Sequence, residues 1–156
     1  MKDKTASESG KKISRADLIG LLNEDLAREY QAIIAYTVYS QTLKGAPYTD
    51  IARELEKHAA QELDHALKLS RQINYFGGMP EVWPKEVLTS NDPKQMLQFD
   101  LANERETLVN YRERIQQAEA MGEFGLSEVL REIVVQEQEH LIDLSDALGI
   151  DPPEIE

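Results

Sequence analysis

The chain contains no cysteine, which excludes disulfide bonds, zinc–thiolate sites and cysteine nucleophiles. It also lacks any apolar run close to the roughly 20 residues that a membrane-spanning helix needs. Its polar start, MKDKTASESGKK, has no apolar segment of the kind that defines a signal peptide. We therefore expect a soluble protein, most simply a cytoplasmic one, with no membrane partner.

Basic residues are outnumbered, since 17 Lys and Arg face 29 Asp and Glu, for a net charge of −12. A nucleic-acid-binding surface needs basic side chains to contact phosphates, so nucleic acid is not expected as a partner. An acidic surface attracts cations, but acidity that serves only solubility explains the composition equally well. Charge alone does not decide between these two explanations.

Glycine and proline are also few, 8 and 6, and they cluster at a handful of places. Between the clusters the apolar residues recur at helical spacing, and no segment alternates with period two, so no sheet is expected. Capping and turn residues mark the ends of four predicted helices, at about 14–45, 48–75, 93–121 and 127–148. Two of the connections are short, while the third is a long loop that we expect Trp83 to anchor. This pattern predicts an all-α, four-helix up-down-down-up bundle with a long crossover between helices two and three.

At 156 residues the chain is expected to hold one domain. We place the bundle at residues 14–149, between a flexible N-terminal tail (1–13) and a short C-terminal tail (150–156).

The second half of the chain repeats the first at an offset of 75 residues. Leucine and alanine matches are common in any helical protein, whereas matched Glu, Tyr and His residues are not. Among the polar matches are Glu29 with Glu104, Tyr36 with Tyr111, Gln61 with Gln136, Glu62 with Glu137, and His65 with His140.

These polar residues interrupt apolar helix faces. In the stretch GLSEVLREIVVQEQEH, the stripe through Leu126, Leu130 and Ile133 continues onto Glu137 and His140, where leucine would be expected. The three-residue spacing of Glu137 and His140 puts both side chains on one face of the helix. The repeat gives the second predicted helix an equivalent Glu and His.

The depths of these residues in the bundle also agree. Glu29 and Glu62 are 33 residues apart with the first turn midway between them, and Glu104 and Glu137 have the same separation about the last turn. Antiparallel neighbours joined in this way bring both members of a pair to one level. We therefore expect four glutamates and two histidines to meet at mid-bundle.

Burying four carboxylates together is costly unless positive charge compensates them. Two divalent metal ions would balance the four charges and leave the histidines as neutral ligands. Oxygen-rich ligands with one imidazole per ion suit iron or manganese; zinc is an alternative and calcium is not. Glu62 and Glu137, beside the histidines, are expected to bridge the ions, with Glu29 and Glu104 as terminal ligands.

Three further residues lie close to this set. Tyr36 and Tyr111 are expected to hydrogen-bond the terminal carboxylates, with simple core packing as the alternative. His58 shares a helix face with Glu54 and Glu62, but its repeat partner is Ile133. We expect either a buried histidine hydrogen-bonded to Glu54 or an additional metal ligand.

The constellation resembles the ferritin-like di-iron carboxylate proteins. The segments LLNEDLAREYQAIIAY, ELDHALKL, DLANERETLVNYRERI and LREIVVQEQEHLIDL are most similar to bacterioferritins, over residues 14 to about 149. The resemblance implies a ferroxidase that oxidises two Fe(II) ions per subunit with O2 or peroxide, for iron storage and detoxification. It implies a catalytic, metal-binding set of Glu29, Glu62, His65, Glu104, Glu137 and His140.

Two departures from bacterioferritins change the expectations. The methionine that binds haem follows the second-helix glutamate in that family, and here Leu63 occupies this position, so haem is not expected. The family's short fifth helix has no counterpart after Leu148. We therefore expect a homo-oligomer, at least a dimer, with a 12-subunit or a 24-subunit cage as the larger assemblies.

Other activities of the fold remain alternatives. A di-metal peroxidase or a manganese catalase without storage would use the same ligand types. A DNA-protecting mini-ferritin would suit the modestly basic N-terminal tail. Mini-ferritins of that kind build their metal site across a subunit interface, however, whereas this ligand set lies within one chain.

Overall fold

The computed structural model describes residues 12–156, so most of the expected N-terminal tail, residues 1–11, lies outside the described part. Four long helices dominate the described residues: α1 (Arg15–Thr42), α2 (Thr49–Tyr75), α3 (Pro93–Ala120) and α4 (Phe124–Leu148). A short 3-10 turn, η1 (Ala46–Tyr48), leads into α2. No strand occurs between residues 12 and 156, which confirms the all-α prediction.

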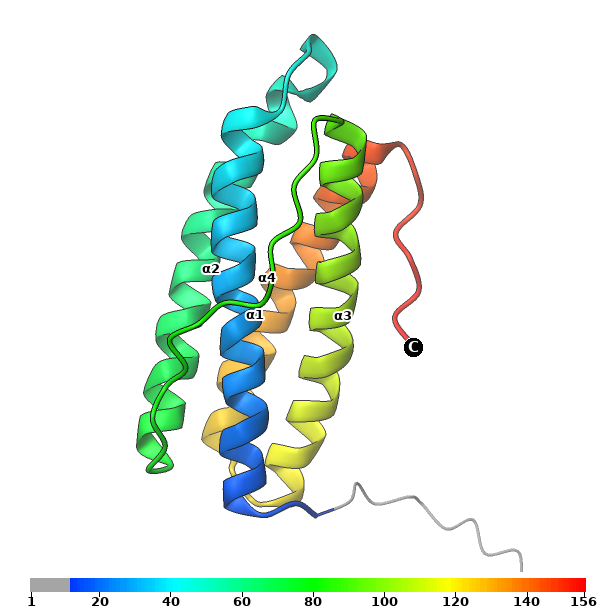
Figure 1. Cartoon of the computed structure of the whole chain (residues 1–156). Coiled ribbons are helices and arrows are strands. Elements are labelled where there is room, and N and C mark those ends of the chain that lie inside the picture. Colours follow the sequence, from blue (N-terminus) through cyan, green and yellow to red (C-terminus); the bar gives the residue numbers. More distant parts are fainter. Residues whose placement is uncertain (1–11) are drawn as a thin grey trace, which may run out of the picture.

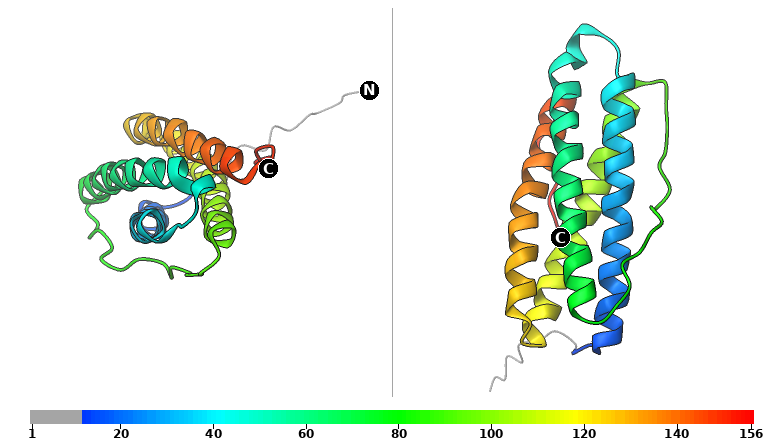
Figure 2. Two further views of the ribbon diagram at one scale, coloured as in Figure 1. Left: turned by 90° about the horizontal axis from the view of Figure 1, so that it is seen from above. Right: turned by 90° about the vertical axis from the view of Figure 1, so that its left-hand side faces the viewer.

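The helices form an up-down-down-up bundle (Figure 1). Helix α1 packs mainly against α2 and α3 mainly against α4, and the two pairs meet through α1–α3 and α2–α4 contacts. The view from above shows the four helices around a common centre (Figure 2). None of the helices in residues 12–156 is long and apolar enough to cross a membrane.

The capping residues act as the sequence predicts. Ser14 and Asp17 form the capping box of α1, and Asp92 caps α3 by accepting from the Lys94 backbone N–H. Gly149 ends α4 in the left-handed conformation, with φ of 67°. These caps stabilise backbone groups that have no partner within a helix.

Two helix ends differ from the prediction by three residues. Helix α1 stops at Thr42 rather than near Gly45, because Gly45 takes a φ of 115° that continues no helix. Helix α4 begins at Phe124 rather than Ser127. Ser127 therefore lies within the first turns of α4, where its hydroxyl donates a 2.8 Å hydrogen bond to Glu119 of α3.

The crossover, residues 76–92, climbs along the outside of α1 (Figure 1). Hydrogen bonds hold it there: the Glu81 N–H donates to Asn23 at 2.7 Å and the Lys85 N–H donates to the Ala27 carbonyl at 3.0 Å. The expectation that Trp83 anchors the loop is wrong, because its side chain is 74% exposed. Instead, the crossover is held against α1 by the hydrogen bonds that its own backbone N–H groups donate.

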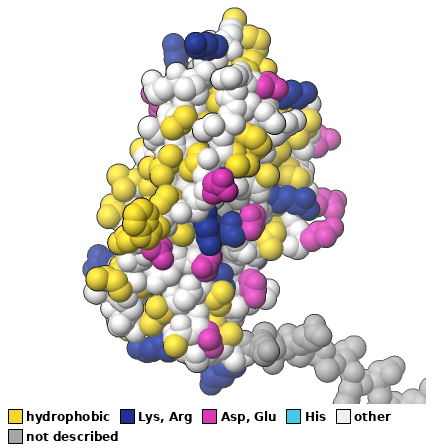
Figure 3. Space-filling model, viewed as in Figure 1, with side chains coloured by type: hydrophobic (Ala, Val, Ile, Leu, Met, Phe, Trp, Pro, Cys, Tyr) yellow, Lys and Arg dark blue, Asp and Glu magenta, His cyan; other side chains and the backbone are white. Residues whose placement is uncertain are grey.

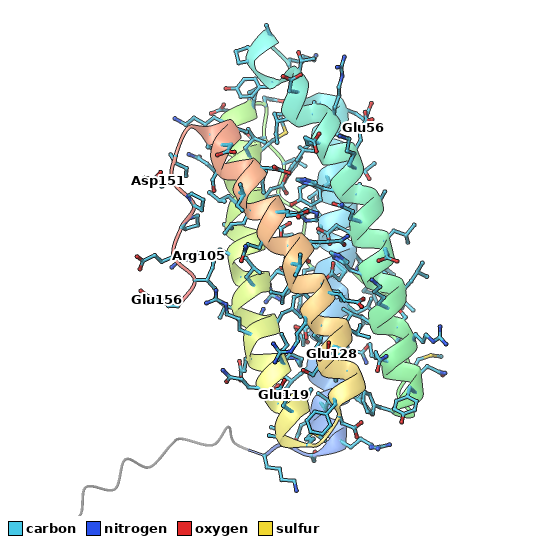
Figure 4. All side chains as sticks on the ribbon, turned by 180° about the vertical axis from the view of Figure 1, so that it is seen from behind. Glu56, Arg105, Glu119, Glu128, Asp151 and Glu156 are labelled. Atoms are coloured by element: carbon cyan, nitrogen blue, oxygen red, sulfur yellow. The ribbon has the colours of Figure 1, made fainter. Side chains whose placement is uncertain are left out.

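The core consists of two apolar clusters with a polar layer between them. One contains Leu22, Leu69 and Leu130, and the other contains Leu55, Leu97 and Leu144. After Gly149 the chain turns back along α3, where Arg112 donates to the Ile155 carbonyl at 2.5 Å. Figure 4 shows this tail, with Asp151 and Glu156, on the α3 side near Arg105.

Candidate metal centre

The polar layer sits at mid-bundle and is closed to solvent. Each helix places one glutamate there, and α2 and α4 each add a histidine three residues further on. All six residues are at least 97% buried: Glu29, Glu62, His65, Glu104, Glu137 and His140. The structure thus brings together every residue that the sequence predicts for the metal set.

His65 marks one half of this layer. Its Nδ1 lies 2.9 Å from Glu62 Oε2, 3.3 Å from Glu137 Oε1 and 3.4 Å from Glu29 Oε2. The other half repeats the pattern around His140, whose Nδ1 lies 3.0 Å from Glu62 Oε1 and 3.1 Å from Glu137 Oε2. Its third neighbour is Glu104 Oε1, at 3.6 Å.

Two glutamates are therefore shared and two are not. Glu62 and Glu137 each point one oxygen at His65 and the other at His140, whereas Glu29 belongs to the first half and Glu104 to the second. In each half, one ligand atom per residue lies within 4.8 Å of the others, a spacing that could hold a metal ion. The two halves of the sequence repeat thus give two equivalent four-residue groups, related by a local two-fold axis.

Several ligand atoms of the layer have no hydrogen-bond partner within the protein, so they are available to bind cations. Four buried carboxylate oxygens have no hydrogen-bond partner, one each from Glu29, Glu62, Glu104 and Glu137. His140 Nδ1 also lacks one, since its approach to Glu62 Oε1 has the distance but not the angles of a hydrogen bond. Buried oxygens of this kind are rare in folded proteins unless something binds them.

Without metal, the histidines are cationic. Burial favours the neutral ring, but hydrogen bonds to surrounding carboxylates, Glu137 foremost, outweigh it and raise the pKa of His65 well above its usual range. Burial and carboxylates, Glu104 foremost, act in the same way on His140 and raise its pKa too. Metal ligation needs both rings neutral, so binding would release protons.

The carboxylates respond to the same crowding. Burial, followed by repulsion from Glu137, raises the pKa of Glu62 well above its usual range. Burial likewise raises the pKa of Glu104 to about 7. Carboxyl groups that bind protons near neutral pH relieve part of the like-charge repulsion in the metal-free layer.

Tyrosines orient the two unshared glutamates across the bundle. Tyr36 of α1 donates a hydrogen bond to Glu104 of α3, and Tyr111 of α3 donates one to Glu29 of α1. The predicted hydrogen bonds to the terminal carboxylates are thus confirmed. Because each bond joins the two halves of the repeat, the tyrosines tie the layer together.

Glutamines orient the two histidines in a way the sequence analysis missed. The far nitrogen of His65 donates to Gln136 Oε1 at 2.6 Å, and that of His140 donates to Gln61 Oε1 at 2.7 Å. Each bond fixes the ring with Nδ1 toward the carboxylates. The signal was available, because Gln61 and Gln136 match each other in the repeat.

Residues 19–151 match the ferritin-like domain family. The chain belongs to this family. The four-helix fold with carboxylate and histidine groups in its centre agrees with that membership.

Bacterioferritins are among the relatives of this ferritin-like chain. It is 25% identical to the bacterioferritin of Brucella melitensis over 134 residues, which cover 85% of this chain and 83% of that protein. It is 26% identical to the bacterioferritin of Rhodobacter capsulatus over 141 residues, or 86% and 88% of the two chains.

Solved structures that resemble this chain are also ferritin-like proteins. A ferritin-like di-iron carboxylate protein of Bacillus anthracis str. Ames has a TM-score of 0.83 and 33% identity, over 87% of this chain and 99% of that one. A dodecameric thioferritin, the bacterioferritin-related protein of Bacteroides fragilis, has a TM-score of 0.81 and 27% identity, over 88% of each chain.

His58 sits beside the ferritin-like centre but has a different partner from the expected one. Its Nε2 lies 3.0 Å from Asp143 Oδ2 of α4, and no hydrogen bond to Glu54 forms. The expectation misplaced this bond because sequence shows neighbours along one helix, not the partner helix. The His58 ring stacks on His140 with centroids 4.0 Å apart, and burial lowers the pKa of His58 to about 4.

Two buried aspartates extend the repeat and were also missed. Asp25 and Asp100 are 75 residues apart, yet their surroundings differ. Arg114 donates to both oxygens of Asp25, at 2.7 and 3.2 Å, whereas Asp100 Oδ2 has no partner. Burial, followed by repulsion from Glu104, raises the pKa of Asp100 well above its usual range.

Proposed function

We propose that this ferritin-like chain is a di-iron ferroxidase that oxidises Fe(II) with O2 or H2O2, for iron storage and detoxification in a homo-oligomeric shell. The observation that carries the proposal is the sharing of Glu62 and Glu137 between the two four-residue groups. Two carboxylates placed between two equivalent groups suit a pair of neighbouring ions better than one ion or none.

In this proposal Glu62 and Glu137 would be shared by the two ions, Glu29 and Glu104 would each be a ligand of one ion, and His65 and His140 would each hold one ion. Carboxylate and imidazole ligands suit iron, with manganese as the alternative. Two iron ions held there would supply the electrons that reduce the oxidant.

The protein's own part is positioning, charge balance and the handling of protons. The glutamines and tyrosines hold the ligand atoms in place, which keeps the cost of rearrangement low. The apolar clusters on either side exclude water from the layer. If cations were bound here, the protons on His65 and His140 would have to leave, and the carboxylates that face the rings would be their nearest acceptors.

All six proposed ligands belong to one chain, which argues against a mini-ferritin site shared between subunits. A manganese catalase would use the same six residues, so the distinction must come from activity. For haem, Leu63 offers no sulfur ligand in this chain, and we propose no haem site.

Exposed apolar side chains support the proposed homo-oligomer. Met79, Val82 and Trp83 of the crossover are largely exposed, and Ile34 and Val38 of α1 add to the apolar surface. Hydrophobic side chains gather on this face in Figure 3. Apolar surface of this kind is typical of contacts between subunits. A dodecamer, as in the Bacteroides fragilis protein, or another closed shell would provide the cavity that storage requires.

The test is a stopped-flow measurement of Fe(II) oxidation by O2 and by H2O2, at up to about two Fe(II) per chain. We expect a rapid phase that saturates at two ions per chain and is absent from Glu137→Gln. A wild-type protein that disproportionates H2O2 in its manganese form, but oxidises Fe(II) no faster than buffer does, would favour the catalase. Sedimentation of the iron-loaded protein would then report whether a shell stores the product.

A further inference from the structure

A second cluster of metal-ligating side chains lies outside the centre described above. Glu54 and His58 of α2 face Asp143 of α4, and one ligand atom from each lies within 4.8 Å of the others. Ligands about 2.1 Å from a shared ion lie up to about 4.2 Å apart, so small side-chain rotations close the set around a cation.

The histidine distinguishes this cluster from an ordinary group of surface acids. His58 is only 2% exposed, and its Nδ1 has no hydrogen-bond partner. Its other nitrogen faces Asp143 at 3.0 Å. A buried imidazole that faces one half-buried carboxylate, with an oxygen of a second within 4.8 Å, is a ligand set for a borderline divalent cation.

An acidic groove leads from solvent to this cluster. It has a volume of about 220 Å3 and runs between the first turns of α2 and the last turns of α4, which lie side by side in Figure 4. Asp50 and Asp146 stand on its walls with Glu54 and Asp143. Four carboxylates around a groove attract cations and raise their local concentration.

The inner end of the cluster touches the central site. The His58 ring stacks on His140, and His140 Nδ1 faces the shared Glu62 and Glu137. A cation at Glu54, His58 and Asp143 would therefore be one histidine ring away from the central ligands.

We propose that Glu54, His58 and Asp143 form a third, mononuclear site for a divalent cation such as Fe(II) or Mn(II). The cation binds there as it comes through the acidic groove, before it reaches the central site. The binding site itself is independent of the ferroxidase proposal, whereas its role in loading rests on that proposal.

One contact opposes binding and provides a test. The Lys57 ammonium lies 2.6 Å from Glu54 Oε1 and competes with a cation for that carboxylate. Lys57 is exposed, so Lys57→Gln should fold normally. Removing this positive charge should tighten binding at the third site by about tenfold.

The main experiment counts Mn(II) bound per chain by the EPR signal of free Mn(II). We expect three ions in wild type, two in the Glu54→Gln/Asp143→Asn variant, and three in the matched control Glu139→Gln, an exposed glutamate of α4. The Glu62→Gln variant should keep the third-site ion, which anomalous diffraction would locate between Glu54, His58 and Asp143.

The outcomes separate the two proposals. If the Glu54→Gln/Asp143→Asn variant binds as many ions as wild type with equal affinity, the third site does not exist. If wild type binds a single ion that only this variant loses, the third site stands and the dinuclear centre fails. For the loading role, kcat/KM for Fe(II) should fall about tenfold in Asp143→Asn, and more than kcat; equal loss of both would overturn that role.

Discussion

Glu62 and Glu137 occupy equivalent positions in the two halves of the bundle, yet their pKa values move in opposite directions. Burial raises the pKa of Glu62, whereas in Glu137 the influence of the neighbouring His140 and His65 rings outweighs burial and lowers the pKa. The two shared carboxyls of the metal-free centre thus differ: the surroundings of Glu62 favour its protonated form, and those of Glu137 favour its ionised form.

This asymmetry predicts different costs for the same substitution. Glu62→Gln should leave the metal-free protein about as stable as wild type at pH 7, because burial and repulsion favour the neutral form of the Glu62 carboxyl, which glutamine resembles. Glu137→Gln should destabilise it by roughly 3–5 kcal/mol, because two buried imidazolium rings lose their shared anion. Chemical denaturation of both metal-free variants measures the difference.

A contrary result would be equal stability of the two variants. The pH supplies a control. The stability that ionised Glu137 contributes is present above the usual glutamate pKa of about 4.3 and is lost as the pH falls toward its lowered folded-state pKa. The gap between wild type and Glu137→Gln should therefore narrow in acid. Neither variant should bind two metal ions in the central site, because each removes a ligand that the two ions share.

Metal loading should release protons. His65 and His140 have raised pKa values without metal and must be neutral as ligands, so at least two protons should leave per chain at pH 7, one from each ring. Glu62 and Glu104, whose pKa values are also raised, should add to this number. Titration calorimetry with Mn(II) in two buffers of different ionisation enthalpy gives this number. Affinity should rise with pH, and a binding enthalpy that is the same in both buffers would contradict the protonated metal-free centre.

Gln61 and Gln136, which accept hydrogen bonds from the histidines, should affect the metal affinity of the central site but not the stability of the bundle. Gln136→Leu removes the acceptor of His65, and Gln61→Leu removes that of His140. Loss of such a partner typically costs 10-fold to 100-fold in metal affinity. Mn(II) titration should show this loss on one ion per variant, while Gln138→Leu, at an exposed position of α4, should bind normally. Equal weakening of both ions would mean that the glutamines act on the bundle rather than on single rings.

Asp100 should make the metal-free protein less stable as the pH rises. Its folded-state pKa is raised, so its favourable contribution is complete below the usual aspartate pKa of about 3.9 and is lost as the pH climbs toward the raised value. Asp100→Asn should gain on wild type by up to about 1.4 kcal/mol per pH unit in that window. Thermal unfolding between pH 5 and 8 tests this, with Asp151→Asn in the exposed tail as control. A constant difference across the range would show that Asp100 does not titrate there.

The sequence predicts the bundle and the central residues well because both depend on spacing. Helical periodicity sets which faces are buried, and the equal separations about two turns bring Glu29 to the level of Glu62 without knowledge of any contact. Partners on other helices could not be predicted in this way. The Asp143 contact of His58 depends on how α2 and α4 lie against each other, which no repeat specifies for an unmatched residue.

The same limit explains Trp83 and Arg114. A lone tryptophan in a loop is usually buried, but this crossover is held by hydrogen bonds to α1, and its apolar side chains face outward. Arg114 binds Asp25 from another helix, and its repeat position holds Tyr39, so the pattern gave no sign of this ion pair. The internal repeat predicts the contacts that both halves of the bundle share, but not the contacts of residues that differ between the halves.

Among residues 12–156, the crossover along α1 is the only stretch of backbone that joins the two helix pairs. On either side of it lie two glutamates and one histidine, so neither hairpin alone holds a complete ligand group. A chain cut at Ser90 would consist of two fragments held together by the shared apolar clusters, the Arg114–Asp25 ion pair and the tyrosine cross-bonds, and in addition by any bound cations. The ions would then act as a reversible cross-link, and the concentration of free metal would shift the equilibrium between the associated and the separate fragments.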